Sequence, residues 1–153
     1  MSYRQVLLVL PFLILSNHFT FLMSLSPSSV ASRNFDLVIY GATGFTGQLA
    51  VEYVHTHYPS LKFALAGRNL AKLESVRTRV CGAESKIPLI VADAVEDPQA
   101  LQNLAASTKV IANYAGTPFF DKALPVVEAC VKQGTCYSDI TGEVPFQRVS
   151  YDR

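Results

Sequence analysis

The sequence predicts an α/β fold with a parallel sheet, built from residues 35 to about 143. Two observations support this prediction. After Asn34, short apolar runs alternate with longer helical stretches, and glycine, proline or aspartate marks many of the junctions. The sequence has no internal repeats of the kind that would indicate a solenoid. Regular alternation of strands and helices is typical of a parallel sheet, because each crossover returns the chain to the same end of the sheet.

The first strand is expected at residues 35–40, FDLVIY, a short apolar run with a β-branched centre that Gly41 ends at once. The elements that follow in the first half are a helix over 46–57, a strand over 63–66, a helix over 70–80 and a strand over 87–92.

The second half carries clearer helix boundaries. Asp97 is a preferred N-cap residue and Pro98 suits the first helical position, which predicts a helix over 98–106. Pro125 opens another helix and Gly134 ends it. Strands are expected over 110–114 and 135–140, and right-handed crossovers give the strand order 3-2-1-4-5 with flanking helices.

Composition limits the functional classes. A chain of 153 residues allows one domain plus a short segment, and a net charge of +1 gives no support for nucleic acid binding. The 3 cysteines lack CxxC spacing, which argues against a disulfide framework or a zinc site. His55 and His57 do not share a helix face, so no metal site is predicted.

Residues 1–34 form a separate hydrophobic segment, because no Asp or Glu precedes Asp36. Arg4 followed by the apolar run 6–15 resembles a signal-peptide core, and residues 29–31 could supply its cleavage site.

A second apolar patch, 19–25, brings the segment near the ~20 residues that cross a bilayer, although Pro11 and Asn17 interrupt it. Three interpretations stay open: a cleaved leader, a retained membrane anchor, or an organelle-type or misassigned N-terminus. The expected location is therefore the secretory pathway, an organelle or a membrane.

The strongest chemical signal is the sequence GATGFTG at the first strand–helix junction. Gly41 permits a tight turn, Gly44 leaves room for a pyrophosphate, and Gly47 lets the helix pack on the sheet. The free N–H groups of the helix start favour phosphate, although a purely structural turn is the alternative, since the usual spacing is GxGxxG. The motif predicts a Rossmann-type domain whose cofactor-binding residues include Gly41, Thr43, Gly44, Phe45, Thr46 and Gly47.

Cofactor choice is decided after the second strand, where the chain reads Ala66-Gly67-Arg68-Asn69. An NAD site usually has a carboxylate there for the ribose 2′-OH. Arg68 can instead pair with the 2′-phosphate of NADP and lie on the adenine, with Asn69 beside it. NADP (NADPH) is the predicted cofactor, and the alternative is that Arg68 only caps or solvates the next helix.

Two further strand ends should face the cofactor. Asp93 could contact the adenine or simply face solvent. Asn113, Ala115 and Gly116 end the fourth strand where the nicotinamide half should lie, and the alternative is a polar turn that satisfies backbone groups.

Catalytic residues remain unknown. The pair Tyr58 and Lys62 has the Tyr-x-x-x-Lys spacing of short-chain dehydrogenases, but it precedes the second strand, at the wrong end of the sheet, and is attributed to chance. Asp139 and Glu143 could orient ribose or substrate, or hold the loop after the last strand.

Six segments together carry a family resemblance: DLVIYGATGFTG, LAGRN, VADAVED, the N-x-A-G turn, PVVEACVKQGT and YSDITGE. Their order and spacing over residues 36–143 resemble the NADP-binding domain of saccharopine dehydrogenase-like oxidoreductases, a group that includes trans-acting enoyl reductases of lipid synthesis. The resemblance implies that Gly41, Gly44, Gly47 and Arg68 hold the cofactor, and that Asp139, Gly142 and Glu143 close the far side of its cleft.

The chain departs from the family at two points. Thr117 stands between Gly116 and Pro118, where the family often has Gly-Pro-aromatic. Family members also continue into an α+β domain that covers the active site and helps dimerisation, whereas this chain ends at Arg153. We therefore expect residues 35–153 to be the NADP-binding domain of a truncated enzyme that lacks its C-terminal substrate domain. A homodimer is expected only if that domain is present.

The resemblance implies hydride transfer to or from an unidentified small-molecule or lipid substrate, and a location at a membrane or lipid droplet. Hydride transfer needs a second reactant held close to the nicotinamide, and little of the chain remains to hold one. The alternative is a non-catalytic NADP-binding or membrane-attached regulatory module.

Overall fold

The computed structural model describes residues 30–116 and 118–151. The predicted leader or anchor falls mostly on residues 1–29, outside the described part, and stays a prediction. Residues 33–153 form one compact unit. Within the described ranges, no helix combines the length and apolarity that a membrane span needs.

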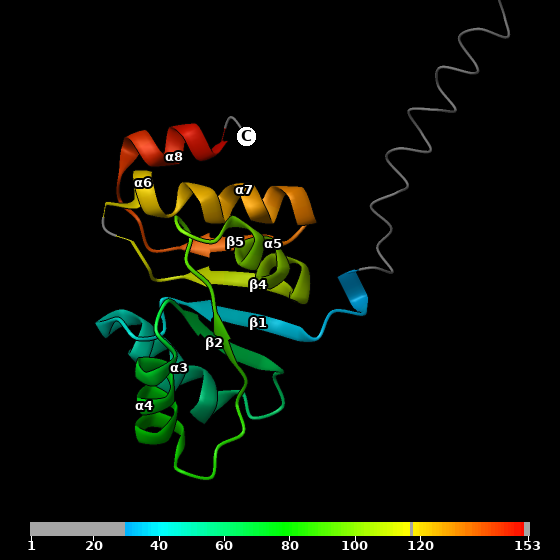
Figure 1. The fold of residues 1–153 in the computed structure, drawn as a ribbon, viewed down its shortest axis with the longest axis vertical. Helices are drawn as coiled ribbons and strands as arrows, with labels where there is room; N and C mark the ends of the chain where they lie inside the picture. The colour runs from blue at the N-terminus through cyan, green and yellow to red at the C-terminus, as the bar shows by residue number, and fades with distance from the viewer. Residues whose placement is uncertain (1–29, 117, 152–153) are drawn as a thin grey trace, which may run out of the picture. The chain divides into compact units, whose positions relative to one another are not determined.

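A single five-stranded sheet forms the centre of this unit, and each strand pair is parallel. Its order is β3-β2-β1-β4-β5 (Figure 1), which confirms the predicted α/β fold and strand order. All carboxyl ends therefore meet at one edge, which we call the carboxyl edge, and all amino ends at the opposite amino edge. The strands are β1 (Phe35–Tyr40), β2 (Phe63–Gly67), β3 (Leu89–Val91), β4 (Thr108–Asn113) and β5 (Cys136–Asp139).

Helices cover both faces of the sheet. The helices α3 and α4 contact each other on one face, and α5 and α7 contact each other on the other. Their bounds, with those of two shorter helices, are α3 (Phe45–His57), α4 (Leu70–Cys81), α5 (Pro98–Ser107), α6 (Phe119–Lys122), α7 (Leu124–Gln133) and α8 (Val144–Tyr151).

Alternate residues of β1 reach the two faces, which explains its continuous apolar sequence. Val38 packs into the cluster that contains Leu104 of α5, and Ile39 packs into the cluster that contains Val51 of α3. These four side chains are at most 1% exposed, and burying one such side chain contributes about 1.5–3 kcal/mol.

The predicted helix boundaries in the second half are confirmed. Asp97 Oδ1 accepts the Ala100 N–H at 2.9 Å, with Pro98 at the start of α5. Gly134 ends α7 in the left-handed conformation, at φ 62° and ψ 36°.

Three elements show the clearest differences from the prediction. The strand β3 is shorter than the expected 87–92. The helices α6 and α8 were not predicted, and the Phe119 and Phe146 rings that join them lie 5.9 Å apart. Both helices therefore depend on a contact between residues far apart in the sequence.

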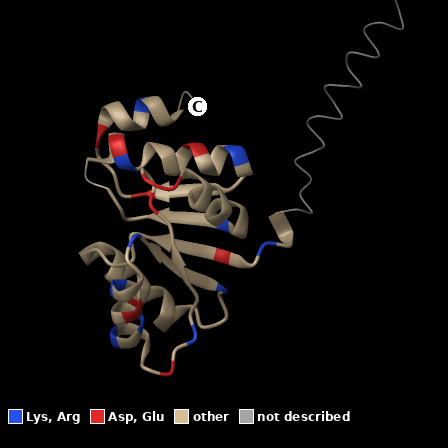
Figure 2. Cartoon of the chain, in the orientation of Figure 1, with Lys and Arg blue, Asp and Glu red and all other residues tan. Residues whose placement is uncertain are grey.

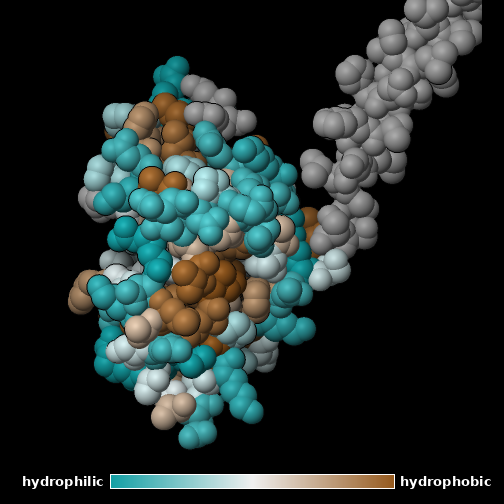
Figure 3. All heavy atoms as spheres, in the orientation of Figure 1, coloured by the Kyte–Doolittle hydropathy of each residue, from teal (hydrophilic) through white to brown (hydrophobic). Residues whose placement is uncertain are grey.

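Charged and apolar residues are distributed differently. Acidic and basic residues are interspersed over the described elements (Figure 2). Apolar residues gather on the face seen in Figure 3, over the β2–β3 part of the sheet. Val91 of the edge strand β3 is accordingly 48% exposed.

Candidate functional site: the carboxyl edge of the sheet

The glycine turn connects β1 to α3 at the carboxyl edge. Gly41 has a φ of 80°, and its N–H and that of Ala42 both donate to the Ala66 carbonyl. A Cβ at position 41 would lie 2.5 Å from the Ala115 nitrogen. Position 41 therefore requires glycine for its backbone conformation and for its contact with the turn after β4.

The other two glycines of the motif, Gly44 and Gly47, differ in how much space surrounds them. A Cβ on Gly47 would lie 2.2 Å from the Gly41 oxygen, so the close packing of α3 on the turn requires glycine there. Gly44 has an ordinary extended conformation, φ −74° and ψ 162°, and an added Cβ would meet only the Gly41 oxygen at 3.4 Å. The fold itself does not require glycine at 44, and a side chain there would occupy the space before α3.

The first turn of α3 is open. Its N-cap, Gly44, offers no side-chain hydrogen bond, and no acidic residue lies in the first turn. The first N–H groups of a helix have no partners inside it, so this end attracts an anion. Phe45 and Thr46 are exposed beside it, and Thr43 is half-buried.

Sequence reasoning missed Gln48, which braces the turn. Its side-chain nitrogen donates to the Thr43 carbonyl at 2.8 Å, and its oxygen accepts a hydrogen bond from Arg79 of α4. No local pattern could reveal this link, because Gln48 and Arg79 lie 31 residues apart.

Arg68 lies at the end of β2 with 74% of its side chain exposed, and its Nε lies 3.9 Å from Asp93 Oδ2. The other oxygen, Asp93 Oδ1, accepts the N–H groups of Val95 and Glu96 at 2.9 and 3.1 Å. Partial burial opposes ionisation of Asp93, but these N–H groups and Arg68 outweigh it and lower the pKa of the carboxyl. Asp93 thus holds the loop after β3 and faces Arg68 at the same time.

A cavity of about 300 Å³ brings several predicted residues together. Arg68 and Asp93 line it from one side, and Ala115 and Gly116 from the turn after β4. Tyr40, which sequence reasoning did not single out, also lines it and donates to the Ala92 carbonyl at 3.2 Å. Burial, with the nearby charge of Asp93, raises the pKa of Tyr40 to about 12, so its hydroxyl stays protonated at neutral pH.

Asn113 and Asn69 use their side chains locally. Asn113 is fully buried; its Oδ1 accepts the Ala115 N–H at 2.9 Å and its Nδ2 donates to the Tyr137 hydroxyl at 3.0 Å. Burial raises the pKa of Tyr137. Asn69 Oδ1 accepts the Lys72 N–H at 3.0 Å and caps α4. The Asn113 contacts are those of the polar-turn alternative, and capping of the helix after β2 is performed by Asn69.

Gly116 is constrained by its own surroundings. Its φ is 101°, and a Cβ would lie 2.8 Å from the Cβ of Lys122. Glycine at this position is therefore explained by the turn, whether or not a cofactor approaches it.

Asp139 and Glu143 shape the loop after β5. Asp139 Oδ1 accepts the Thr141 N–H at 3.0 Å, and the Thr141 hydroxyl accepts the Glu143 N–H at 3.1 Å. The Glu143 carboxylate accepts the N–H groups of Phe119 at 2.9 Å and Phe120 at 3.4 Å, at the start of α6. Both carboxylates hold backbone groups, as the loop-holding alternative predicts.

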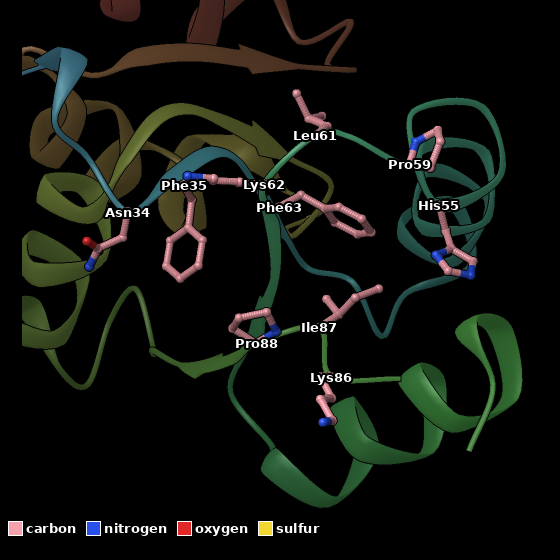
Figure 4. Close-up of a pocket in the computed structure, with 10 residues that line it drawn as sticks. All are labelled: Asn34, Phe35, His55, Pro59, Leu61, Lys62, Phe63, Lys86, Ile87 and Pro88. Carbon is pink, nitrogen blue, oxygen red and sulfur yellow. The ribbon is translucent and has the colours of Figure 1, made fainter. Parts of the chain in front are cut away.

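The other residues considered in the sequence analysis, namely the possible metal ligands His55 and His57, Lys62 and the cysteines, do not contribute to this cavity. In residues 30–116 and 118–151, no three His, Cys, Asp or Glu side chains are grouped to hold a metal. Lys62 lines a cavity at the amino edge (Figure 4), away from the glycine turn. The three cysteines are free, and burial raises the pKa of the Cys130 thiol to about 12.

Comparison with known proteins identifies the family to which this domain belongs. Residues 37–152 match the model of the saccharopine dehydrogenase NADP-binding domain. The chain belongs to this family. Its cofactor is NADP, as the sequence around Arg68 predicts.

Relatives in mycobacteria are substantially similar to this chain. It is 42% identical over 124 residues to a trans-acting enoyl reductase of Mycobacterium ulcerans, and 43% identical over 124 residues to that of Mycobacterium tuberculosis. Each match covers 81% of this chain and 29% of the relative. The chain therefore spans less than a third of the length of these relatives.

Solved structures agree on the fold. A triphenylmethane reductase from Citrobacter sp., solved with NADP(H), aligns with a TM-score of 0.55 and 20% identity over 76% of this chain and 43% of its own. An isoflavone reductase aligns with a TM-score of 0.52 and 15% identity over 79% of this chain and 43% of its own. At this identity the likeness shows the Rossmann-like fold alone.

Proposed function

We propose that this chain binds NADPH at the carboxyl edge for a reductase that delivers hydride to an enoyl group, the carbon–carbon double bond conjugated to a carbonyl. The observation that carries the proposal is the open start of α3, where Gly44 leaves space that the fold does not need. Arg68 lies at the same edge with an exposed guanidinium group. NADPH offers a pyrophosphate to the first feature and a 2′-phosphate to the second.

The proposed contacts follow from these positions. The N–H groups at the start of α3 bind the pyrophosphate, with the Thr43 and Thr46 hydroxyls and the exposed Phe45 beside it. Arg68 turns from Asp93 to the 2′-phosphate, while Asp93 and Asn69 border the adenosine. The turn formed by Asn113, Ala115 and Gly116 borders the nicotinamide half.

The proposed activity rests on the relatives. Bound NADPH supplies the hydride, and the described residues bind and orient it. The relatives' names, trans-acting enoyl reductases, support an enoyl substrate. A lipid-related acceptor, membrane association through residues 1–34, and dimerisation through a further domain are parts of the same proposal.

A second candidate is an NADP-binding module without turnover. The carboxylates of Asp139 and Glu143 are engaged with backbone N–H groups, which favours structural roles over proton transfer. Oxidation of NADPH in the presence of a crotonyl thioester separates the two candidates, because only the reductase consumes NADPH.

The binding part is tested by titrating the full chain with NADPH and with NADH, followed by nucleotide fluorescence. A charge-assisted hydrogen bond contributes about 1.5–3 kcal/mol, so NADPH should bind roughly ten to a hundred times more tightly. Arg68→Ala should remove most of that preference. The exposed Lys132 lies on α7, so Lys132→Ala is a charge-matched control that should retain it.

Equal affinity for the two nucleotides in the unmodified chain would contradict the role of Arg68. Absence of binding by either nucleotide would contradict the role of the glycine turn.

A further inference from the structure

The peptide group between Thr43 and Gly44, in the glycine turn, is fixed at both ends. Its carbonyl accepts a hydrogen bond from Gln48 Nε2 at 2.8 Å, and its N–H donates to the Gly41 carbonyl at 3.0 Å. A trans peptide is planar, so its C=O and N–H point in opposite directions and can only turn together. The half-buried Gln48 side chain therefore also determines where the Gly44 N–H points.

This peptide needs a restraint because residue 44 is a glycine. Turning the peptide over changes the φ of Gly44 from −74° to a positive value. Glycine adopts positive φ about as readily as negative φ, whereas a residue with a Cβ does not. A turned peptide would free the Thr43 carbonyl oxygen to face an anion before α3, where N–H groups are needed. The space that Gly44 leaves is thus accompanied by a peptide that can spoil it.

The contacts of Gln48 require a side chain that both donates and accepts. The Thr43 carbonyl can only accept, and the Arg79 guanidinium, which donates to Gln48 Oε1, can only donate. Glutamine meets both demands, whereas glutamate has no N–H and lysine has no acceptor. Arg79 lies in the last turn of α4, so the neighbouring helix determines which way the Gln48 amide faces.

We infer that Gln48 is a positioning residue for the cofactor pyrophosphate, and that Arg79 acts through it. Gln48 keeps the Thr43 carbonyl engaged, so that the N–H groups of residues 45–47 meet the anion. The inference rests on the proposed function, because it takes the start of α3 as the phosphate site. NADPH and NADH share the pyrophosphate, so Gln48 should affect both nucleotides equally, whereas Arg68 should affect NADPH alone.

The first measurement needs no nucleotide: it is amide hydrogen exchange at the Gly44 N–H in the full chain, followed by NMR. In Gln48→Ala the peptide can turn and release this N–H from the Gly41 carbonyl. Exchange should become roughly three- to tenfold faster, as expected for one ordinary hydrogen bond, with exchange in β1 unchanged. Adding Gly44→Ala should slow it again, because alanine disfavours the positive φ.

The matched control is Gln102→Ala. Gln102 is also half-buried, and its Oε1 accepts a hydrogen bond from Gln133 Nε2 at 2.9 Å between α5 and α7, on the opposite face of the sheet. This variant loses a side-chain hydrogen bond of the same kind and should keep the slow exchange at Gly44. Unchanged exchange at Gly44 in Gln48→Ala, or equal acceleration in both variants, would overturn the inference.

The second measurement titrates the same variants with NADPH and with NADH. Gln48→Ala should weaken both nucleotides by the same factor, roughly three- to tenfold, and leave the preference for NADPH unchanged. Gln102→Ala should leave both affinities unchanged. A loss for NADPH alone would place Gln48 with Arg68 at the 2′-phosphate and overturn the inference.

The two measurements separate this inference from the proposed function. If the unmodified chain binds neither nucleotide, the proposed function fails and the phosphate role of Gln48 fails with it, whatever the exchange result. If the unmodified chain and Gln48→Ala bind both nucleotides equally well, the proposed function stands and this inference alone is overturned.

A double-mutant cycle tests whether Arg79 acts through Gln48. Arg79→Ala should weaken both nucleotides by no more than Gln48→Ala does, and should add nothing in the double variant. Additive losses would show that the Arg79 charge attracts the phosphate directly, and would overturn this part. If Gln48→Ala does not fold, Gln48→Glu repeats the exchange measurement, because it keeps an acceptor for Arg79 but has no N–H for Thr43.

Discussion

The helices α3 and α4 both begin at the carboxyl edge of the sheet, but only α4 has a side chain that caps its first N–H groups. Each starts at the carboxyl edge directly after a strand. Asn69 caps α4 by accepting the Lys72 N–H, whereas Gly44 provides α3 with no side-chain acceptor. The start of α5 resembles α4, because Asp97 caps it.

This difference concerns how the backbone N–H groups at each helix start are satisfied. Unpaired N–H groups at a helix start are costly unless water, a side chain or a ligand accepts from them. At α4 and α5 the chain supplies its own acceptor. At α3 the N-cap residue Gly44 supplies no side-chain acceptor. In the proposed function, the phosphate occupies the space that the missing side chain leaves.

The largest effect on the free energy of unfolding should come from substituting the glycines that the fold requires, Gly41 and Gly47. Gly47→Ala forces a Cβ to 2.2 Å from the Gly41 oxygen, and Gly41→Ala adds an unfavourable φ to a backbone clash. Overpacking alone costs about 1–3 kcal/mol, and the left-handed conformation adds about 1–2 kcal/mol at position 41. Urea unfolding should show both variants strongly destabilised, and a native-like midpoint for either would contradict the packing described here.

Gly44→Ala sharpens the comparison, because it should separate binding from stability. Its Cβ meets only an ordinary contact at 3.4 Å, so the unfolding midpoint should change little. The same methyl group occupies the space proposed for the pyrophosphate, and NADPH affinity should fall about tenfold or more. Unchanged NADPH affinity in the folded variant would mean that Gly44 has no contact with the cofactor.

Asn69→Ala tests the capped helix. Losing an N-cap costs about 1 kcal/mol of stability, which denaturant unfolding can resolve. NADPH affinity should change less than in Gly44→Ala, because the Asn69 oxygen is already used by the Lys72 N–H. The reverse order of the two effects on binding would favour a direct cofactor contact for Asn69.

The smallest effect should be the contribution of Asp36 to the pH dependence of stability. Hydrogen bonds from Lys109 and from the Lys62 N–H lower the pKa of this carboxyl below its usual 3.8. Its stabilising contribution is therefore complete above the unfolded-state pKa and is lost as the pH falls through the folded-state pKa, below about pH 4. Asp36→Asn should flatten this acid-side slope in unfolding midpoints, and an identical slope would assign it to other carboxylates.

The sequence predicted the features that are local. The glycine turn and the Asp97 cap follow from residues adjacent in the chain, and the structure confirms them. The strand order follows from the alternation of strands and helices together with right-handed crossovers, and it is confirmed as well. The helix α6 could not be predicted, because its first N–H groups are accepted by Glu143, 24 residues later. The brace between Gln48 and Arg79 also depends on a tertiary contact, because the two residues lie 31 positions apart.

The most direct test of the central claim is amide hydrogen exchange of the full chain with and without NADPH. We predict slower exchange at the N–H groups of residues 45–47 and in the segment around Arg68, with the loop before β2 at the amino edge unchanged. Omitting NADPH should leave the start of α3 exchanging faster than the capped start of α4. If NADPH binds and exchange at residues 45–47 is nevertheless the same with and without it, the claim that the open start of α3 is the phosphate site is contradicted.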